Sequence, residues 1–263
     1  MMRRKLEQGV PVIGTWNTLG SPLVTEVIAH SGMDFQIIDF EHGPMDFQQI
    51  HLHVSACGLN SGCSPLVRIP FNYDWMALQA LDQGAHGIVV PNMTNKITVN
   101  SFINSIKYHP KGKRGFTPFS KSGGFSNKKI DEYVRISNEQ IIGVVIIESK
   151  EGMINLEEIV MQDGVDIVYF GVYDLSQSLG HPGNVKHASV IQEIQNGVNI
   201  VNKYGKCAGG FVPQSKDEIK WLLDMGMRFI TYDVDASILN HHLNDISEWF
   251  DIENDKTNPE LLR

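Results

Sequence analysis

The sequence predicts a single-domain (β/α)8 TIM barrel, because short apolar runs alternate with longer amphipathic segments along its 263 residues. This alternation is typical of parallel strands joined by crossover helices. Several of the short runs are apolar throughout, as strands buried on both faces are. Eight such units follow one another without a linker or a break in composition. They favour one closed barrel over an open doubly wound sheet, and we expect one domain spanning residues 1–263.

Eight runs rich in Val, Ile and Phe are the predicted strands. They are Val12-Trp16, Phe35-Glu41, Pro65-Pro70, Gly87-Pro91, Ile142-Glu148, Ile167-Gly171, Cys207-Val212 and Phe229-Val234. Helical periodicity fills most of the intervals, at Pro22-His30, Phe47-Leu59, Trp75-Gln83, Val99-Tyr108, Leu156-Gln162, Val190-Tyr204, Lys216-Met225 and Ile238-Phe250. Glycines that can adopt the left-handed conformation end several helices, at Gly32, Gly84, Gly164, Gly205 and Gly226.

Residues 110–138 interrupt the alternation between the fourth and fifth strands. The segment is rich in Gly, Ser, Lys and Pro and has weak periodicity, so it predicts a long loop that is functional or mobile. Within it, Gly112-Lys113-Arg114-Gly115 is either an anion-binding turn or a solvated basic loop.

The charge and the apolar content indicate which partners to expect. The net charge is −8 and no Lys/Arg cluster occurs beyond Lys111 to Arg114, which argues against nucleic acid and anionic membranes. No apolar run approaches the roughly 18 residues needed to span a bilayer. The basic start is followed by Leu6-Glu7-Gln8-Gly9 where a signal peptide needs an apolar region, and the three cysteines lack metal-ligand spacing. We therefore expect a cytoplasmic protein with reduced thiols, whose partners are small molecules or other subunits.

Carboxylates at two strand ends indicate a metal site. The active site of a (β/α)8 barrel forms at the carboxyl ends of its strands. Glu148 ends the fifth predicted strand and Asp174 follows the sixth, so both should lie at the mouth. Two carboxylates, together with water and substrate oxygens, suit Mg²⁺ or Mn²⁺. Each could instead form a salt bridge or cap a helix, as Asp174 could before Leu175-Ser176.

The second and third strands add a guanidinium and an imidazole. Arg68 lies on an otherwise apolar strand, so it must meet a carboxylate of the protein or of a ligand, such as a 2-oxo acid. His42 follows the second strand as a metal ligand, a general base or a packed polar residue. A lone histidine is most often packed; Asp39 lies three residues earlier and could orient and charge the imidazole, which adds support for the general base and leaves the three alternatives open.

The motifs that are missing restrict the chemistry further. None of the eight predicted strands contains a lysine that could form a Schiff base inside the barrel. The sequence also lacks GxGxxG, P-loop and GxSxG motifs, so nucleotide cofactors and serine-hydrolase chemistry have no local support. We expect a divalent metal ion to act as the electron sink.

Several of these segments resemble those of the HpcH/HpaI-type class II pyruvate aldolases. The most specific are Ile38-Asp39-Phe40-Glu41-His42-Gly43-Pro44 and Phe170-Gly171-Val172-Tyr173-Asp174-Leu175-Ser176, and similar motifs run through most of the chain. The resemblance implies an aldolase that cleaves or forms 4-hydroxy-2-oxo acids, acting on a 2-oxo acid such as pyruvate and an aldehyde. It further implies a homohexamer, built as a dimer of trimers, in which subunits exchange the C-terminal helix.

The resemblance also implies roles for individual residues. Glu148 and Asp174 would bind a divalent metal ion (Mg²⁺, Mn²⁺ or Co²⁺), and Arg68 would hold the keto or enolate oxygen, with Gly171 and Tyr173 in the substrate-binding part. His42, assisted by Asp39, would move the proton. Asp82 would approach the active site of a neighbouring subunit.

Three residues depart from the family pattern. Ile146 stands where a glutamine is common, Val172 where a proline is common and Tyr232 where a small residue is usual. These changes leave the enolate-forming residues intact but make the ordinary aldol substrate uncertain. An alternative is a citrate-synthase-like condensation of an oxo acid with an acyl-CoA. An alternative of another class is a non-catalytic barrel that only binds an oxo acid.

Overall fold

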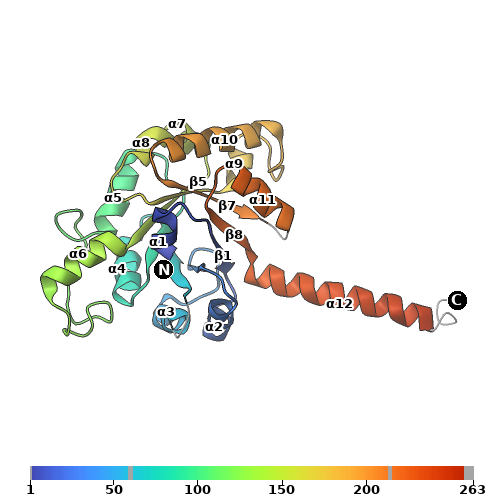
Figure 1. Ribbon diagram of the computed structural model, residues 1–263, viewed down its shortest axis with the longest axis horizontal. Coiled ribbons are helices and arrows are strands. Elements are labelled where there is room, and N and C mark those ends of the chain that lie inside the picture. The colour runs from blue at the N-terminus through green and yellow to red at the C-terminus, as the bar shows by residue number, and fades with distance from the viewer. Residues whose placement is uncertain (1, 59–61, 213–214, 258–263) are drawn as a thin grey trace.

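The computed structural model describes residues 2–58, 62–212 and 215–257, which form a closed parallel barrel in the order β1 to β8 (Figure 1). Every predicted strand is confirmed, with ends that move by at most two residues. The bounds are β1 Val12–Asn17, β2 Phe35–Asp39, β3 Ser64–Arg68, β4 Gly87–Val90, β5 Ile142–Ile147, β6 Ile167–Phe170, β7 Cys207–Val212 and β8 Phe229–Val234.

Helices surround the barrel and include all those predicted. Their bounds are α1 Met2–Glu7, α2 Pro22–His30, α3 Ile50–Gly58, α4 Asp74–Asp82, α5 Lys96–Ile106, α6 Ile130–Gln140, α7 Lys150–Ile154, α8 Leu156–Val160, α9 Val172–Ser178, α10 Ala188–Lys203, α11 Lys216–Asp224 and α12 Asp235–Thr257, with a 3-10 turn, η1 Phe47–Gln49, before α3. The glycines expected to end helices all have positive φ, between 69° and 102°.

The expectation of one long loop at residues 110–138 is wrong at its end, because α6 begins at Ile130. Tertiary hydrogen bonds hold the end of this helix. The Asn138 side chain accepts a hydrogen bond from the Tyr108 backbone N–H at 2.7 Å and donates one to the Tyr108 carbonyl at 3.0 Å. The buried Lys107 ammonium donates to the carbonyls of Asn138 and Ile141 at its end. Such contacts join residues about thirty positions apart and have no local signature in the sequence.

Apolar side chains fill both sides of the sheet. Inside the barrel, Phe35 and Phe229 stack with their ring centroids 4.0 Å apart, and Met2 of α1 packs in the same cluster. Outside, a larger cluster joins the outward faces of the strands to α4, α5 and α10. All three cysteines are buried and form no disulfide within the described chain. The scaffold is therefore rigid beneath the strand ends.

The strand register sets the positions of the polar residues. Asp39 and Arg68 end β2 and β3 and are direct partners in the ladder. Ile147 pairs with Phe170, so the next residues, Glu148 and Gly171, also lie side by side. The carboxyl ends of neighbouring strands thus bring these four residues to one rim.

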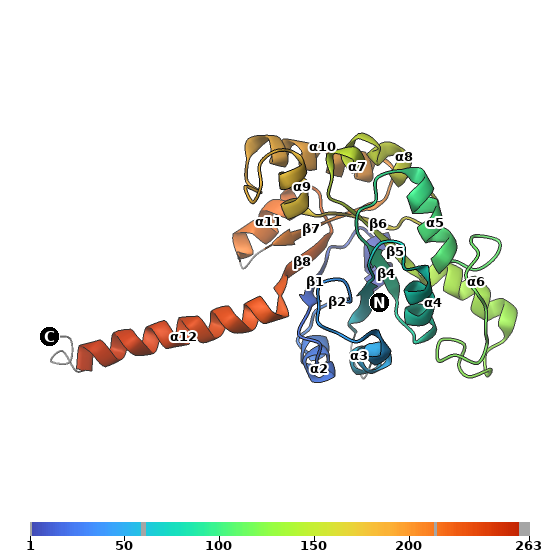
Figure 2. The ribbon, with the colours of Figure 1, turned by 180° about the vertical axis from the view of Figure 1, so that it is seen from behind.

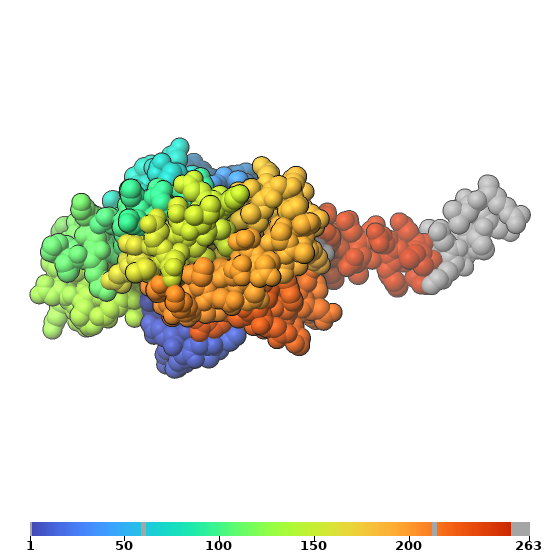
Figure 3. Space-filling model, turned by 90° about the horizontal axis from the view of Figure 1, so that it is seen from above, coloured from blue at the N-terminus to red at the C-terminus, as the bar shows by residue number. Residues whose placement is uncertain are grey.

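Helix α12 projects away from the barrel (Figures 1, 2 and 3). Its base is fixed because the buried Asp235 carboxylate accepts hydrogen bonds from the Thr18 and Leu19 backbone N–H groups at 2.9 and 3.1 Å. Beyond the base, the helix exposes an apolar stripe, which consists of Leu239, Leu243, Ile246 and Phe250. Within the described chain, none of the helices is both long enough and apolar enough to cross a membrane.

Candidate active site

A cleft opens at the carboxyl ends of the strands. Two adjoining cavities, of about 300 and about 540 Å³, share His42, Arg68, Glu148 and Asp174 in their walls. Gly171 and Tyr173 line the inner cavity, as the sequence led us to expect. The structure therefore brings together all but one of the predicted site residues, the exception being Asp82.

Arg68 is held by two carboxylates and an aromatic ring. Its Nε donates to Asp39 Oδ1 at 2.7 Å and its Nη2 donates to Asp39 Oδ2, which makes a bidentate pair. Its Nη1 lies 3.3 Å from Glu41 Oε2, and the guanidinium carbon lies 4.4 Å from the centre of the Trp16 ring. The planar fork is therefore fixed in orientation before any ligand binds.

Asp39 contacts His42 through the backbone rather than through the ring. The Asp39 carboxylate, with 1% of its side chain exposed, accepts hydrogen bonds from the Glu41 and His42 N–H groups at 3.0 and 3.2 Å. Among the described residues, no hydrogen bond joins it to the His42 imidazole, which is exposed in the cleft. Asp39 thus positions both the guanidinium and the turn that carries His42.

Glu148 is a half-buried carboxylate with one hydrogen bond from the protein. Its Oε1 accepts a hydrogen bond from the Asn92 N–H at 2.7 Å. Gly171 lies so close that a Cβ there would be 2.8 Å from Glu148 Oε2, so only glycine leaves room for the carboxylate. Burial raises the pKa of Glu148 to about 7, and the nearby charge of Asp174 adds to the rise. The deprotonated form therefore needs a positive charge beside it.

Glu41 also lines the outer cavity, where Arg68 is its ion-pair partner at 3.3 Å. Its Oε2 is buried without a hydrogen-bond partner, and burial raises the pKa of the carboxyl despite the nearby Arg68. Asp174, in the first turn of α9, adds to the negative charge. In the described chain no three His, Cys, Asp or Glu side chains are grouped closely enough to hold a metal ion by themselves. Glu148 and Asp174 fit a hard divalent ion only if water or substrate oxygens complete its shell.

Sequence reasoning gave no role to three residues of this site. Glu41 pairs with Arg68, Trp16 covers the guanidinium, and the Asn92 N–H holds Glu148. Glu41 and Trp16 lie at the ends of predicted strands, so the reasoning that selected Asp39 and Arg68 could also have selected them. The contribution of Asn92 comes from its backbone, in a left-handed conformation with φ of 55°, and has no side-chain signature.

The chain is similar to proteins of known activity. The sequence profile of the HpcH/HpaI aldolase/citrate lyase family matches residues 12–241. The chain belongs to this family. It is 30% identical to a hydroxypyruvate/pyruvate aldolase of Roseobacter denitrificans, over 94% of this chain and 96% of that protein. It is also 30% identical to a 5-keto-4-deoxy-D-glucarate aldolase of Shigella boydii, over 90% and 91% of the two chains.

A solved structure of another activity is also similar. The structure of the citrate synthase SbnG is 28% identical, with a TM-score of 0.87, and the match covers 97% of this chain and 98% of that chain. This member of the HpcH/HpaI family therefore has both aldolases and a citrate synthase among its relatives.

In this family member, the inner cavity has an apolar wall. Ile146 lines it beside Gly171, and the rings of Tyr173 and Phe211 meet with their centroids 6.0 Å apart. The glutamine that is common in the family at position 146 would have placed an amide here. The isoleucine instead packs with the interior cluster of the barrel.

Asp82 lies at the end of α4, away from this cleft. Its Oδ1 accepts a hydrogen bond from Arg114 Nη2 at 2.6 Å, and its carbonyl accepts one from the Ser122 N–H at 3.0 Å. Within one chain it ties the loop after α5 to α4. An approach to a neighbouring subunit stays a prediction.

We predict that the thermal stability of the metal-free protein depends on pH through Glu148. Its folded pKa of about 7 exceeds the ordinary 4.5, so its contribution to stability is complete below the unfolded pKa and is lost as the pH rises through 7. Metal-free protein should therefore melt at a lower temperature at pH 8 than at pH 6. Scanning calorimetry of Glu148→Gln should show a smaller difference, and Glu132→Gln, at an exposed site, should behave as wild type. An unchanged difference in Glu148→Gln would contradict this assignment.

Proposed function

We propose that this protein is a metal-dependent carbon–carbon lyase that cleaves or forms 4-hydroxy-2-oxo acids through a pyruvate-type enolate. The observation that carries the proposal is the meeting of Arg68, His42, Glu148 and Asp174 in one cleft. A guanidinium, an imidazole and two carboxylates there can supply an oxyanion partner, a base and metal ligands.

Glu148 and Asp174 would hold the divalent ion, with Mg²⁺, Mn²⁺ or Co²⁺ as candidates. The raised pKa of Glu148 supports this, because the nearby charges of Asp174 and Glu41 add to the rise and a positive ion would offset them. When bound, such an ion supplies positive charge that lowers the energy of an enolate oxygen.

The chain's own residues would orient the substrate and move the proton. Arg68 lines the cleft. Asp39 occupies the Nε–Nη2 edge of its guanidinium, and the remaining N–H donors of the terminal nitrogens can hold the keto or enolate oxygen. The exposed His42 imidazole has no protein partner among the described residues and is therefore available to take a proton from the substrate. Gly171 and Tyr173 would contact the remainder of the substrate.

Two alternatives stay open. The structural likeness to a citrate synthase supports condensation of an oxo acid with an acyl-CoA, which changes the partner of the enolate. A non-catalytic oxo-acid-binding barrel is less well supported, because binding alone does not require a base, a metal site and an oxyanion partner together.

One experiment tests the proposal against both alternatives. Cleavage of 4-hydroxy-2-oxo acids and condensation of oxo acids with acyl-CoA would be assayed side by side, with chelator and after adding back Mg²⁺, Mn²⁺ or Co²⁺. Chelation should abolish cleavage, and a divalent ion should restore it. Full activity after exhaustive metal removal would refute the metal role, and condensation without cleavage would favour the citrate-synthase-like alternative.

We further propose that α12 packs on another copy of the chain in a homohexamer. Helices α2 and α11, whose positions flank α12, each expose apolar side chains, among them Leu23, Val27 and Trp221 (Figure 1). An apolar helix that leaves its own barrel and apolar neighbours that stay uncovered are complementary surfaces. In such an assembly Asp82 would approach a neighbouring active site.

Charges placed on the stripe of α12 should therefore reduce the size of the assembly. Leu243→Glu with Phe250→Glu should yield smaller species, measured by light scattering after size exclusion, because desolvating a carboxylate in an apolar interface is costly. Asn244→Glu is a matched control on the same helix, beside the stripe. If both proteins had the wild-type mass, the stripe would not be the contact.

A further inference from the structure

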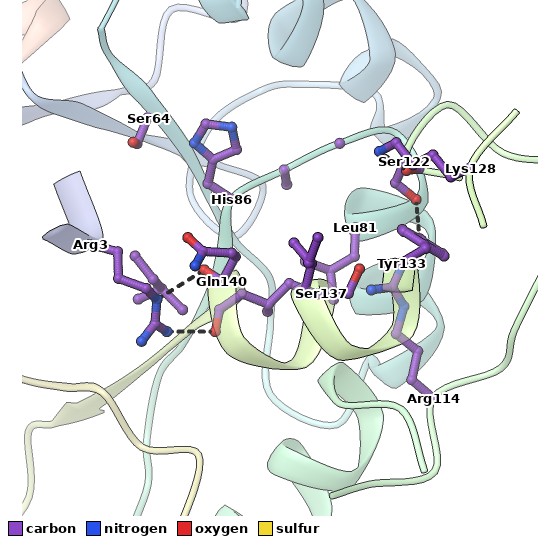
Figure 4. Close-up of a pocket in the computed structure, with 15 residues that line it drawn as sticks. Arg3, Ser64, Leu81, His86, Arg114, Ser122, Lys128, Tyr133, Ser137 and Gln140 are labelled. Atoms are coloured by element: carbon purple, nitrogen blue, oxygen red, sulfur yellow. Dashed lines mark hydrogen bonds between the residues drawn. The ribbon is translucent and has the colours of Figure 1, made fainter. Parts of the chain in front are cut away.

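A second cavity lies at the amino ends of the strands, on the opposite side of the barrel from the active site. It has a volume of about 300 Å³, similar to the inner catalytic cavity. Its floor includes Ser64 and Ile142, the first residues of β3 and β5, and His86, which precedes β4. Helix α6 and the loop before it cover it (Figure 4). This size is at the lower end of small-molecule sites, which span roughly 300–1,000 Å³.

The charge of the wall is positive. Arg3, Arg114 and Lys128 line the cavity, and none of the described residues in its wall is a carboxylate. The whole protein carries a net charge of −8, so a cavity wall whose described residues include three cations and no carboxylate differs in sign from the protein as a whole. Arg3 is already occupied, because it pairs with Asp166 at 3.0 Å and donates to the Gln140 and Ile141 carbonyls. It closes one end of the cavity (Figure 4).

Arg114 is the buried cation of this site. Only 1% of its side chain is exposed, which shows that the alternative of a solvated basic loop at residues 112–115 is wrong for this residue. Its Nη2 donates to Asp82, its guanidinium carbon lies 4.5 Å from the centre of the Tyr108 ring, and its Nε is buried without a partner. A buried N–H donor normally has an acceptor, and the Arg114 Nε lacks one.

Lys128 and a group of hydroxyls lie beside it. The Lys128 ammonium donates to the Ser122 carbonyl at 2.7 Å and lies 5.3 Å from the centre of the Tyr133 ring. Within the described residues no carboxylate pairs with it. The Ser122 and Tyr133 hydroxyls share a hydrogen bond at 2.8 Å, and Ser137 of α6 lines the same end (Figure 4). An oxyanion there would meet a cation and several hydroxyl donors.

Besides His86 and Gln140, the rest of the wall is mainly apolar and comes from Leu81, Ala85, Ile136, Ile141 and Ile142. Polar donors at one end and aliphatic side chains beside them suit an amphiphilic ligand. We propose that this cavity binds a small organic anion, whose carboxylate meets Arg114 and Lys128 and whose hydrocarbon part packs against the isoleucines.

The experiment uses hexanoate as the probe, with titration calorimetry on the full chain. Hexanoate should bind saturably, whereas hexanol and hexylammonium should not. Lys128→Gln should weaken binding by about tenfold, as expected for one lost charge-assisted hydrogen bond, and Lys129→Gln should not. Lys129 carries the same charge at the next position but does not line the cavity.

A second variant separates this site from the catalytic cleft. Ser137→Trp should fill the cavity and abolish hexanoate binding while the metal-dependent deuterium exchange of pyruvate stays at the wild-type rate. Hexanoate binding that survives both Lys128→Gln and Ser137→Trp would overturn the proposal. So would inorganic phosphate binding as tightly as hexanoate, since the aliphatic wall would then contribute nothing.

Discussion

Replacing Arg68 with alanine should lower turnover by roughly 10²–10³, the usual effect of losing one oxyanion donor. The structure adds a second effect. Arg68 is the bidentate partner of the buried Asp39, so the variant leaves a carboxylate without its counter-charge. Breaking a buried ion pair costs about 3–5 kcal/mol of unfolding free energy. Steady-state cleavage of the oxo acid and urea unfolding would measure the two losses separately.

A double variant distinguishes catalysis from folding. Arg68→Met with Asp39→Asn removes both charges, so stability should largely return while turnover stays low. Arg68→Lys should rescue turnover poorly, because an ammonium lacks the planar fork. If Arg68→Ala turned over substrate at the wild-type rate, the guanidinium would be only the structural partner of Asp39.

Replacing His42 with alanine should slow the exchange of pyruvate methyl protons with solvent deuterium by about 10²–10⁴, the span expected for a positioned acid–base group. Exchange reports enolisation, which precedes carbon–carbon bond formation in the aldol direction, and NMR follows it directly. Metal affinity should stay nearly unchanged, since the proposed ligands are Glu148 and Asp174.

The matched control is His51→Ala, because His51 is exposed on α3 outside the cleft. It should exchange pyruvate protons as wild type does. If His42→Ala exchanged pyruvate protons at the wild-type rate, another group would be the base. No exchange by the wild-type protein with metal would favour an enzyme that accepts only another oxo acid or an acyl donor.

The barrel could be predicted because its determinants are local. Strands buried on both faces are continuous apolar runs such as Ile142–Ile147, and the glycines after the helices require positive φ. Helix α6 was missed because it follows a segment rich in Gly, Ser and Lys, and because the hydrogen bonds of Asn138 that hold its end reach residues about thirty positions away.

The sequence predicts which residues line the cleft, but not which of them pair with each other. Strand ends identified Asp39, His42, Arg68, Glu148 and Asp174, since the ends of parallel strands converge. Sequence spacing suggested that Asp39 serves the imidazole, but the β2–β3 register gives its carboxylate to Arg68. Register depends on tertiary pairing, which a single sequence does not display.

The hydrogen bonds that fix the base of α12 to Thr18 connect this helix with the active site. Thr18, which donates both its N–H and its hydroxyl to Asp235, also lines the inner cavity. If α12 docks on a neighbouring subunit as proposed, the base of this helix and the wall of the inner cavity share Thr18. By mass action, dilution that releases α12 from the neighbouring subunit would loosen the wall of the inner cavity at Thr18. Specific activity would then fall on dilution even where every barrel remained folded.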